Sequence, residues 1–393
     1  MKKVFLFSLF LVLGLVLSQC LPVWLGEAFL TAEKVAKTLM FVCLAFIMIN
    51  VGREFELDKT KWRSYAADYF IAMATAAVPW IMVAFYYMFL LPADLFGNWD
   101  AWKENLLLSR FAAPTSAGIL FTMLAAAGLR REWIYKKTQV LAIFDDLDTI
   151  LLMIPLQIFM IGFKWQLFAV VIVITFLLVI GWKKLGTIRL SQTWKSILFY
   201  AVCIVAVTES IYLFTKWMMG ADGAIHIEVL LPAFVLGMVM KTVHQHGNRD
   251  EKITGMISYL FMFLVGLSTP QFIGIDHGHR ITEAVGIIAA QPMPSWEVLI
   301  VHVIVVTLLS NLGKMFPLFF YRDRQLEERL ALSVGMFTRG EVGAGIIVIA
   351  MGYNLGGPAL IISVLSLVLN LLLTGGFVVI VKRLAQQAYG LKE

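Results

Sequence analysis

The sequence LAIFDDLDTI, residues 141–150, places two adjacent aspartates and a third acid inside a long apolar stretch. Hydrophobic sequence continues on both sides, from about residue 133 to residue 163. A carboxylate in the hydrocarbon of a bilayer is costly, so such groups usually line a path for ions or protons. Because two neighbouring carboxylates cannot both ionise cheaply in a low-dielectric site, protons and a small cation compete to neutralise them. This competition is the chemistry of a cation/proton exchanger.

The composition is that of a membrane protein. Of the 393 residues, 60% are hydrophobic and 15% are charged, whereas a soluble domain carries roughly 25% charged residues. A membrane-spanning helix needs about 20 largely apolar residues, so the chain accommodates roughly a dozen spans joined by short loops. The net charge of +6 is explained by basic residues in the loops that orient membrane proteins. We therefore expect no nucleic-acid partner.

We predict an all-α polytopic membrane protein with about 12 transmembrane helices. Basic residues concentrate in every second loop, which by the positive-inside rule places both termini in the cytoplasm. We expect residues 1–393 to form a single transmembrane domain with no soluble domain, and no motif for a nucleotide is present. The expected spans are residues 4–21, 34–51, 64–91, 105–128, 134–162, 163–181, 194–218, 226–243, 253–269, 296–321, 327–353 and 358–383.

Two of these spans contain sequence that interrupts a helix. The fourth holds Pro114 within RFAAPTSAG, residues 110–118, and proline removes a backbone donor and clashes with the preceding turn. The eleventh holds GMFTRGEVGAG, residues 335–345, which is rich in glycine and carries two charges. Interruptions seven spans apart, one in each half, are typical of transporters built from inverted repeats. We therefore predict inverted repeats with two discontinuous crossing helices, spans 4 and 11.

Several motifs resemble those of the cation/proton antiporter superfamily, in particular the NhaA and NapA type of sodium/proton antiporter. LAIFDDL at 141–147 is similar to the family's fifth-helix Asp-Asp motif, and NLGKMFP at 311–317 resembles its tenth-helix Gly-Lys segment. GMFTRGEVG at 335–343 looks like the Gly-Met-x-x-Arg-Gly-Glu-Val-Gly motif of the NapA-like and Kef-like branches. PTS at 114–116 matches the fourth-helix break less closely. The resemblance covers about residues 46–383.

The resemblance implies that Asp145 pairs with Lys314 while Asp146 faces the ion cavity. Asp145 and Asp146 are accordingly the expected ligands for sodium and for protons. A hard cation such as sodium prefers oxygen ligands. Thr115, Ser116 and the carbonyl groups freed at the break in span 4 are the candidates to complete the shell.

Asp148 departs from the family pattern, which usually has a small residue at this position. It lies three positions after Asp145 and on the same helical face. It is either a third titrating group or the partner of a cation from a neighbouring helix. Arg339 and Glu341 in span 11 are expected to brace the unwound segment or to gate the cytoplasmic funnel rather than to bind the ion. For all these charges, an ion pair that merely fixes the packing is the competing interpretation.

The sequence thus predicts a secondary active sodium or lithium/proton antiporter and not an enzyme. Core helices (about 64–162 and 296–383) are expected to move against scaffold or dimer helices (about 1–60 and 194–269) in alternating access. The resemblance to the electrogenic branch, with two acids and one lysine, implies net charge movement in each cycle. Two alternatives remain open, a sodium-coupled symporter for an organic solute on the same fold and a Kef-like potassium/proton antiporter.

The expected partners are the lipid bilayer, monovalent cations, protons and a second copy of the chain in a homodimer. No cofactor and no nucleotide is expected, because the transported ions are substrates. A bacterial inner membrane is the expected location, crossed many times by the chain, and pH homeostasis is the expected role. The residues alone leave open the preference among sodium, lithium and potassium.

Overall fold

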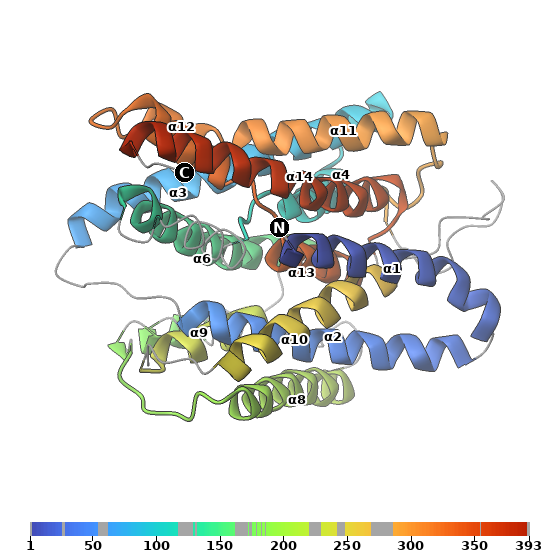
Figure 1. Ribbon diagram of the computed structural model, residues 1–393. Coiled ribbons are helices and arrows are strands. Elements are labelled where there is room, and N and C mark those ends of the chain that lie inside the picture. The colour runs from blue at the N-terminus through green and yellow to red at the C-terminus, as the bar shows by residue number, and fades with distance from the viewer. Residues whose placement is uncertain are drawn as a thin grey trace.

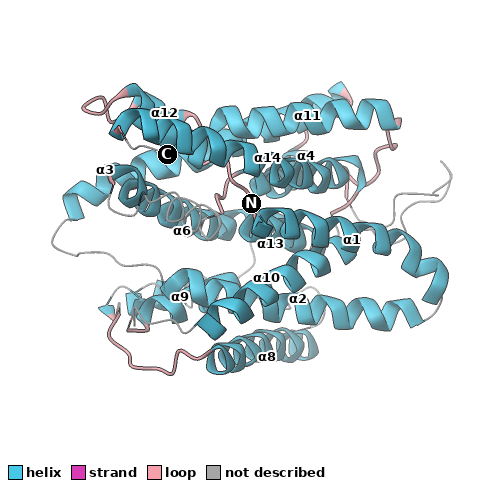
Figure 2. Cartoon of the chain, viewed as in Figure 1, coloured by secondary structure: helices cyan, strands magenta, loops and turns pink. Residues whose placement is uncertain are grey.

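Helices make up most of the part of the chain that the structure, a computed structural model, describes (Figure 2). Within that part there is no β-strand, apart from an isolated bridge between Ile188 and Met240. The described residues are 2–25, 28–53, 62–116, 129, 132–161, 172, 175–177, 179–181, 183–184, 186–219, 229–241, 248–268, 286–353 and 355–390.

The helices follow the order of the predicted spans. In the first half they are α1 (Lys2–Leu25), α2 (Ala28–Arg53), α3 (Trp62–Leu90), α4 (Trp99–Ser109) and α6 (Trp133–Ile161). The described residues between 172 and 181, in the predicted sixth span, are helical. In the second half the helices are α8 (Trp194–Met219), α9 (Leu230–Val239), α10 (Asn248–Leu267), α11 (Trp296–Gly313), α12 (Leu326–Gly335), α13 (Glu341–Gly352) and α14 (Gly357–Tyr389).

Five helices of the described part are long and apolar enough to cross a membrane, by length and composition. Their outer faces carry large apolar side chains, such as Phe89 and Trp217, which are 72% and 82% exposed. Exposed apolar surface on this scale suits contact with lipid rather than with water. The five helical stretches are Thr31–Arg53, Ala66–Leu90, Trp194–Met218, Trp296–Phe319 and Gly357–Tyr389.

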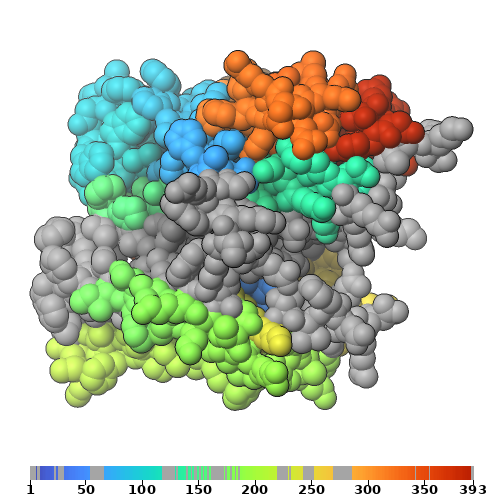
Figure 3. Space-filling model, turned by 90° about the vertical axis from the view of Figure 1, so that its left-hand side faces the viewer, coloured from blue at the N-terminus to red at the C-terminus, as the bar shows by residue number. Residues whose placement is uncertain are grey.

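The described helices lie roughly side by side in two groups (Figure 1). One group contains α3, α4, α6, α11, α12, α13 and α14, and the other contains α1, α2, α8, α9 and α10. In the second group α1 packs along α10, and α2 packs along α9 and α8. The end-on view keeps this order, with the segments after residue 300 at the top and those near residue 200 at the bottom (Figure 3). The two groups meet where α13 and α14 touch α10 and α1.

Several helix ends differ from the predicted boundaries, and two of them position the site. The fourth span begins at Trp99 and not at residue 105, because the Asn98 side chain caps α4 by accepting hydrogen bonds from the backbone N–H groups of Asp100 and Ala101, at 2.8 and 3.4 Å. The tenth span was expected to run to residue 321, but α11 ends at Gly313 and a 3₁₀ turn follows at Phe316–Phe319. Lys314 is therefore the C-cap residue of α11.

Glycines allow two pairs of helices to touch backbone to backbone. A Cβ atom on Gly14 of α1 would overlap the Phe263 carbonyl of α10, and one on Gly266 of α10 would overlap the Leu11 carbonyl of α1. The same reciprocal contact joins Gly52 of α2 to Gly237 of α9. Small residues at such crossings let membrane helices approach closely and gain van der Waals contact.

Candidate ion-binding site

The two predicted interruptions lie against each other. After α4 the chain makes a 3₁₀ turn at Arg110–Ala112 and is not helical from there to Ser116, and the chain is again non-helical between α12 and α13. The Ser116 backbone N–H donates to the Thr338 carbonyl at 2.8 Å, and the Thr115 hydroxyl donates to the Met336 carbonyl at 3.2 Å. Each break thus satisfies backbone groups that the other has freed, as buried non-helical backbone requires.

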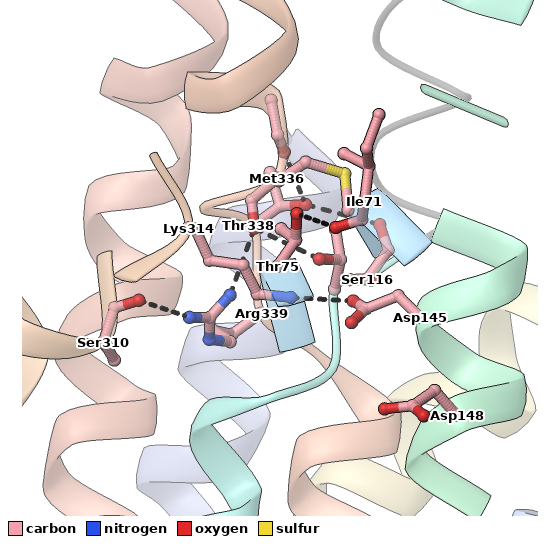
Figure 4. Close-up of polar contacts among 12 residues, drawn as sticks. Ile71, Thr75, Ser116, Asp145, Asp148, Ser310, Lys314, Met336, Thr338 and Arg339 are labelled. Atoms are coloured by element: carbon pink, nitrogen blue, oxygen red, sulfur yellow. Dashed lines mark hydrogen bonds and ion pairs between the residues drawn. The ribbon is translucent and has the colours of Figure 1, made fainter. Parts of the chain in front are cut away.

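A buried ion pair joins Asp145 of α6 to Lys314 at the end of α11. The Lys314 Nζ atom lies 2.8 Å from Asp145 Oδ2, and both side chains have no exposed surface (Figure 4). The other oxygen, Asp145 Oδ1, has no hydrogen-bond partner in the part of the chain that the structure describes. Only one of the two oxygens of this carboxylate thus has a partner among the described residues. Gly313, the residue before Lys314, lies with its backbone directly against Pro79 of α3.

The side chains of Asp146 and Glu341 lie outside the described residues. Asp146 is placed only as a helical position of α6, next to Asp145, and Glu341 as the first residue of α13. Their expected roles, as cation ligand and as gate or support, remain predictions. No cluster of three or more histidine, cysteine, aspartate or glutamate side chains suited to a resident metal occurs among the residues whose placement is described.

Asp148 forms a second buried ion pair, one helical turn from the first. Its Oδ2 atom lies 3.2 Å from the Nη2 atom of Arg110, which also donates to the Asp148 carbonyl at 3.0 Å. The Arg110 guanidinium lies 4.4 Å from the centroid of the Trp80 ring. Of the two alternatives for Asp148, the partner of a cation from a neighbouring helix describes this geometry.

Sequence reasoning missed Arg110 as the partner of Asp148 and Trp80 as its support. A signal was present, because a lone arginine within an apolar span is costly and normally has an acidic or carbonyl partner inside the protein. Asp148 was the unassigned acid at a similar depth. Two unexplained buried charges of opposite sign in adjacent spans predict a pair.

Within the described part of the chain, the partners of Arg339 are backbone carbonyl groups and not a carboxylate. Its Nη1 atom donates to the Met336 carbonyl and its Nη2 atom to the Ser310 carbonyl, both at 3.1 Å (Figure 4). These carbonyls lie at the ends of α12 and α11, where the unsatisfied C=O groups of a helix attract positive charge. The fully buried guanidinium thus connects α11 to the break in span 11, which is the geometry of a bracing residue.

Buried charge is concentrated where α4, α6, α11 and α12 meet. Figure 4 shows Asp145 and Asp148 projecting from one side of α6 toward the interrupted segments. Among the described charged side chains that are 2% exposed or less, the two acids Asp145 and Asp148 stand against three bases, Lys314, Arg110 and Arg339. Charged groups gathered inside a membrane bundle beside interrupted helices are typical of secondary transporters.

The comparison with protein families identifies the family of this chain. The model of the family described as "Sodium/hydrogen exchanger, transmembrane" matches residues 2–383. The chain therefore belongs to the sodium/hydrogen exchanger family, whose members are multi-pass membrane transporters that exchange cations for protons rather than enzymes.

Two solved structures have a similar fold. The sodium proton antiporter MjNhaP1 from Methanocaldococcus jannaschii at pH 8 superposes with a TM-score of 0.55 at 12% sequence identity, over 98% of this chain and 92% of that chain. An electron-microscopy structure of MjNhaP1 gives a TM-score of 0.52 at 13% identity, over 97% of this chain and 92% of that chain. The comparison with curated proteins gives no match.

Proposed function

We propose that the protein is a sodium or lithium/proton antiporter in which the cation and protons compete for Asp145 and Asp146. The observation that carries this proposal is the fully buried pair of Asp145 and Lys314, which meet at 2.8 Å beside the contact between the two helix breaks. One oxygen of Asp145 contacts the Lys314 ammonium, and the other has no donor in the described region. Such a carboxylate can exchange the ammonium for a proton or for a transported cation.

The competition couples the two fluxes. A buried lysine gives up its proton more readily than an arginine does, so arrival of a cation at the aspartates displaces the Lys314 ammonium and releases protons. When protons return on the other side of the membrane, the pair with Asp145 forms again and the cation leaves. Because one occupant excludes the other, neither ion completes the cycle alone.

Alternating access requires one group of helices to move against the other. We assign the core to about 64–162 and 296–383 and the scaffold to about 1–60 and 194–269, a division supported by the two groups of helices in Figure 1. The backbone contacts of Gly14 with Gly266 and of Gly52 with Gly237 support inverted repeats. If span 1 (α1) corresponds to span 8 (α9) and span 2 (α2) to span 9 (α10), the repeat relates the contact of α1 with α10 to the contact of α9 with α2.

The same proposal includes twelve spans, crossing helices in spans 4 and 11, and both termini in the cytoplasm. It also includes a homodimer in a bacterial inner membrane. Two acids that share one exchangeable lysine favour electrogenic exchange, with net charge moved in each cycle. The membrane potential contributes about 2.3 kcal/mol per charge per 100 mV, which drives sodium outward when more than one proton enters per sodium.

The buried arginines favour an antiporter over a symporter for an organic anion. A substrate carboxylate is usually held by the paired N–H groups of an arginine. Arg110 already binds Asp148, and Arg339 already binds two backbone carbonyls. We therefore do not propose a sodium-coupled symporter or a Kef-like potassium/proton antiporter, and the experiment below distinguishes both from the proposed antiporter.

Purified protein in liposomes with a pH-sensitive dye and an imposed proton gradient tests the proposal. Addition of sodium or lithium is expected to collapse the gradient in the wild type and in the Asp94→Asn variant, whose acid is on the surface, but not in Asp146→Asn or Asp145→Asn. Collapse by potassium alone identifies the Kef-like activity. No collapse by any of the three cations across a wide pH range refutes antiport and favours the symporter.

A further inference from the structure

Two acids one turn apart on α6 have different cationic partners. Asp145 meets a lysine at 2.8 Å, and Asp148 meets an arginine at 3.2 Å. Positions three apart in a helix are separated by about 4.5 Å along its axis and by about 60° around it. The four side chains are buried, with exposures of 2% or less. The second pair therefore lies within direct electrostatic reach of the proposed ion site.

Arg110 is fixed from several directions. It ends α4, its Nη2 atom bonds both to the side chain and to the carbonyl of Asp148, and its guanidinium packs on the Trp80 ring. Trp80 follows Pro79, and Pro79 lies against the glycine that precedes Lys314. The same turn of α3 therefore supports both cationic side chains, although they arrive from different helices.

The two cations differ in chemistry. A guanidinium keeps its proton at every pH that a protein experiences, whereas an ammonium releases its proton when its surroundings change. The partner of Asp145 can therefore leave as a neutral amine, but the partner of Asp148 carries a permanent charge. The guanidinium, which is 3.2 Å from Asp148 Oδ2, cannot leave this carboxyl group by giving up a proton.

We propose that Arg110 is a positioning residue that removes Asp148 from the exchange reaction and so sets how many charges the transporter moves per cycle. The proposal rests on the proposed function. With Arg110 in place, Asp145, Asp146 and Lys314 are the exchanging groups. Without Arg110, Asp148 becomes an unpaired buried acid, and it takes up a proton or a cation from the same pathway.

The alternative is a pair that only holds span 4 against α6. Buried ion pairs are often replaced by neutral residues with little loss of stability, while removal of one partner is strongly destabilising. Removal of one partner therefore lowers stability under both interpretations. It changes the affinity for the ion and the coupling ratio only if the pair sets the charge moved per cycle.

Four proteins in liposomes distinguish the two interpretations: the wild type, Arg110→Gln, Asp148→Asn and the double variant that carries both changes. In each, the apparent KM for sodium is measured against pH. The coupling ratio is measured as the membrane potential at which a fixed sodium gradient produces no net flux. Melting of the detergent-solubilised protein, followed by size-exclusion chromatography, reports folding separately.

In Asp148→Asn, the unpaired Arg110 charge repels sodium, and we expect the apparent KM to rise on the order of tenfold to a hundredfold. In Arg110→Gln, the freed Asp148 lowers the KM, shifts its pH dependence and changes the reversal potential. The double variant is neutral at both positions and regains the KM and the reversal potential of the wild type.

A double variant no better than the worse single variant overturns the proposal. So does an Arg110→Gln protein with the KM, pH profile and reversal potential of the wild type and only a lower rate. If Arg110→Gln does not fold, the comparison of Asp148→Asn with the double variant is still decisive. The KM for sodium must rise in Asp148→Asn and return to the wild-type value in the double variant. A wild type that exchanges no cation for protons refutes the proposed function instead.

Discussion

Gly313 sets the distance between α3 and α11, and its replacement by alanine tests how the Lys314 site is positioned. A Cβ atom on Gly313 would lie 2.5 Å from Pro79 Cα and 2.6 Å from Pro79 N, whereas ordinary contact begins at 3.4 Å. The helices must therefore separate by about 1 Å, which in a well-packed interior costs about 1–3 kcal/mol of stability. A shift of this size moves Lys314, the next residue, out of hydrogen-bond range of Asp145.

The ion pair is the competitor of sodium for Asp145, so weakening the pair makes sodium binding easier. A hydrogen bond to a charged group is worth about 1.5–3 kcal/mol, and we therefore expect Gly313→Ala to lower the apparent KM for sodium by about tenfold to a hundredfold. The melting temperature falls at the same time. Both are measured on purified protein, the KM by sodium-driven dye recovery in liposomes and the melting temperature in detergent.

Gly375→Ala is the matched control, because Gly375 is also in a helix of the core group and nothing lies within 4 Å of its Cβ position. Alanine there is expected to leave KM unchanged and stability equal or slightly higher, since alanine favours a helix over glycine by about 0.5–1 kcal/mol. The reasoning fails if Gly313→Ala behaves like this control. It also fails if the KM rises, because a general loss of structure weakens binding.

Further predictions concern the packing of the helices and the polar contacts of Tyr321 and Asn370. Gly266→Ala forces α1 from α10 and is expected to lower stability by about 1–3 kcal/mol, whereas Gly255→Ala, open in the same helix, leaves the melting temperature unchanged. Burial, and then the Asp68 carboxylate 2.9 Å away, raise the pKa of Tyr321. A raised pKa contributes stability below the ordinary value of about 10 that is lost as pH rises through the folded value. Tyr321→Phe, which also loses the hydrogen bond to Asp68, should therefore melt lower than the wild type at pH 8, and the difference should shrink as the pH rises above about 10. Asn370 donates to Asn311 at 2.9 Å between α14 and α11, so Asn370→Leu is expected to cost about 1 kcal/mol in melting experiments, and an unchanged melting point would contradict that bond.

The helical, membrane-protein character and the non-helical segments were readable from the sequence because hydropathy and proline or glycine act locally. Pro114 and the glycines of 335–345 mark the non-helical segments, and the structure breaks α4 and the α12–α13 span there. The start of α4 was missed because a capping asparagine, Asn98, outweighs the polar character of the residues that follow it. The end of α11 was placed too late because apolar sequence continues through the 3₁₀ turn.

The site was readable only in part because pairing between side chains depends on how helices pack. The resemblance to known antiporters implied the contact between Asp145 and Lys314. The two lone charges in adjacent spans could have suggested that Arg110 pairs with Asp148. The contact itself, and the position of Trp80 over the guanidinium, depend on the rotation of α3, α4 and α6 about their axes, which no local pattern gives. Hydropathy is nearly uniform around these helices and does not fix that rotation.

The sequence separations of the two ion pairs have a consequence for biogenesis. Arg110 precedes Asp148 by 38 positions, whereas Lys314 follows Asp145 by 169 positions. As the ribosome works from the N-terminus, the arginine is already synthesised when α6 enters the bilayer, and the lysine is not. In the nascent first half, Asp148 thus already has its counter-charge, while Asp145 gains its partner only after most of the second half has been translated. A chain that stops before residue 314 lacks the cation that pairs with Asp145 in the complete protein.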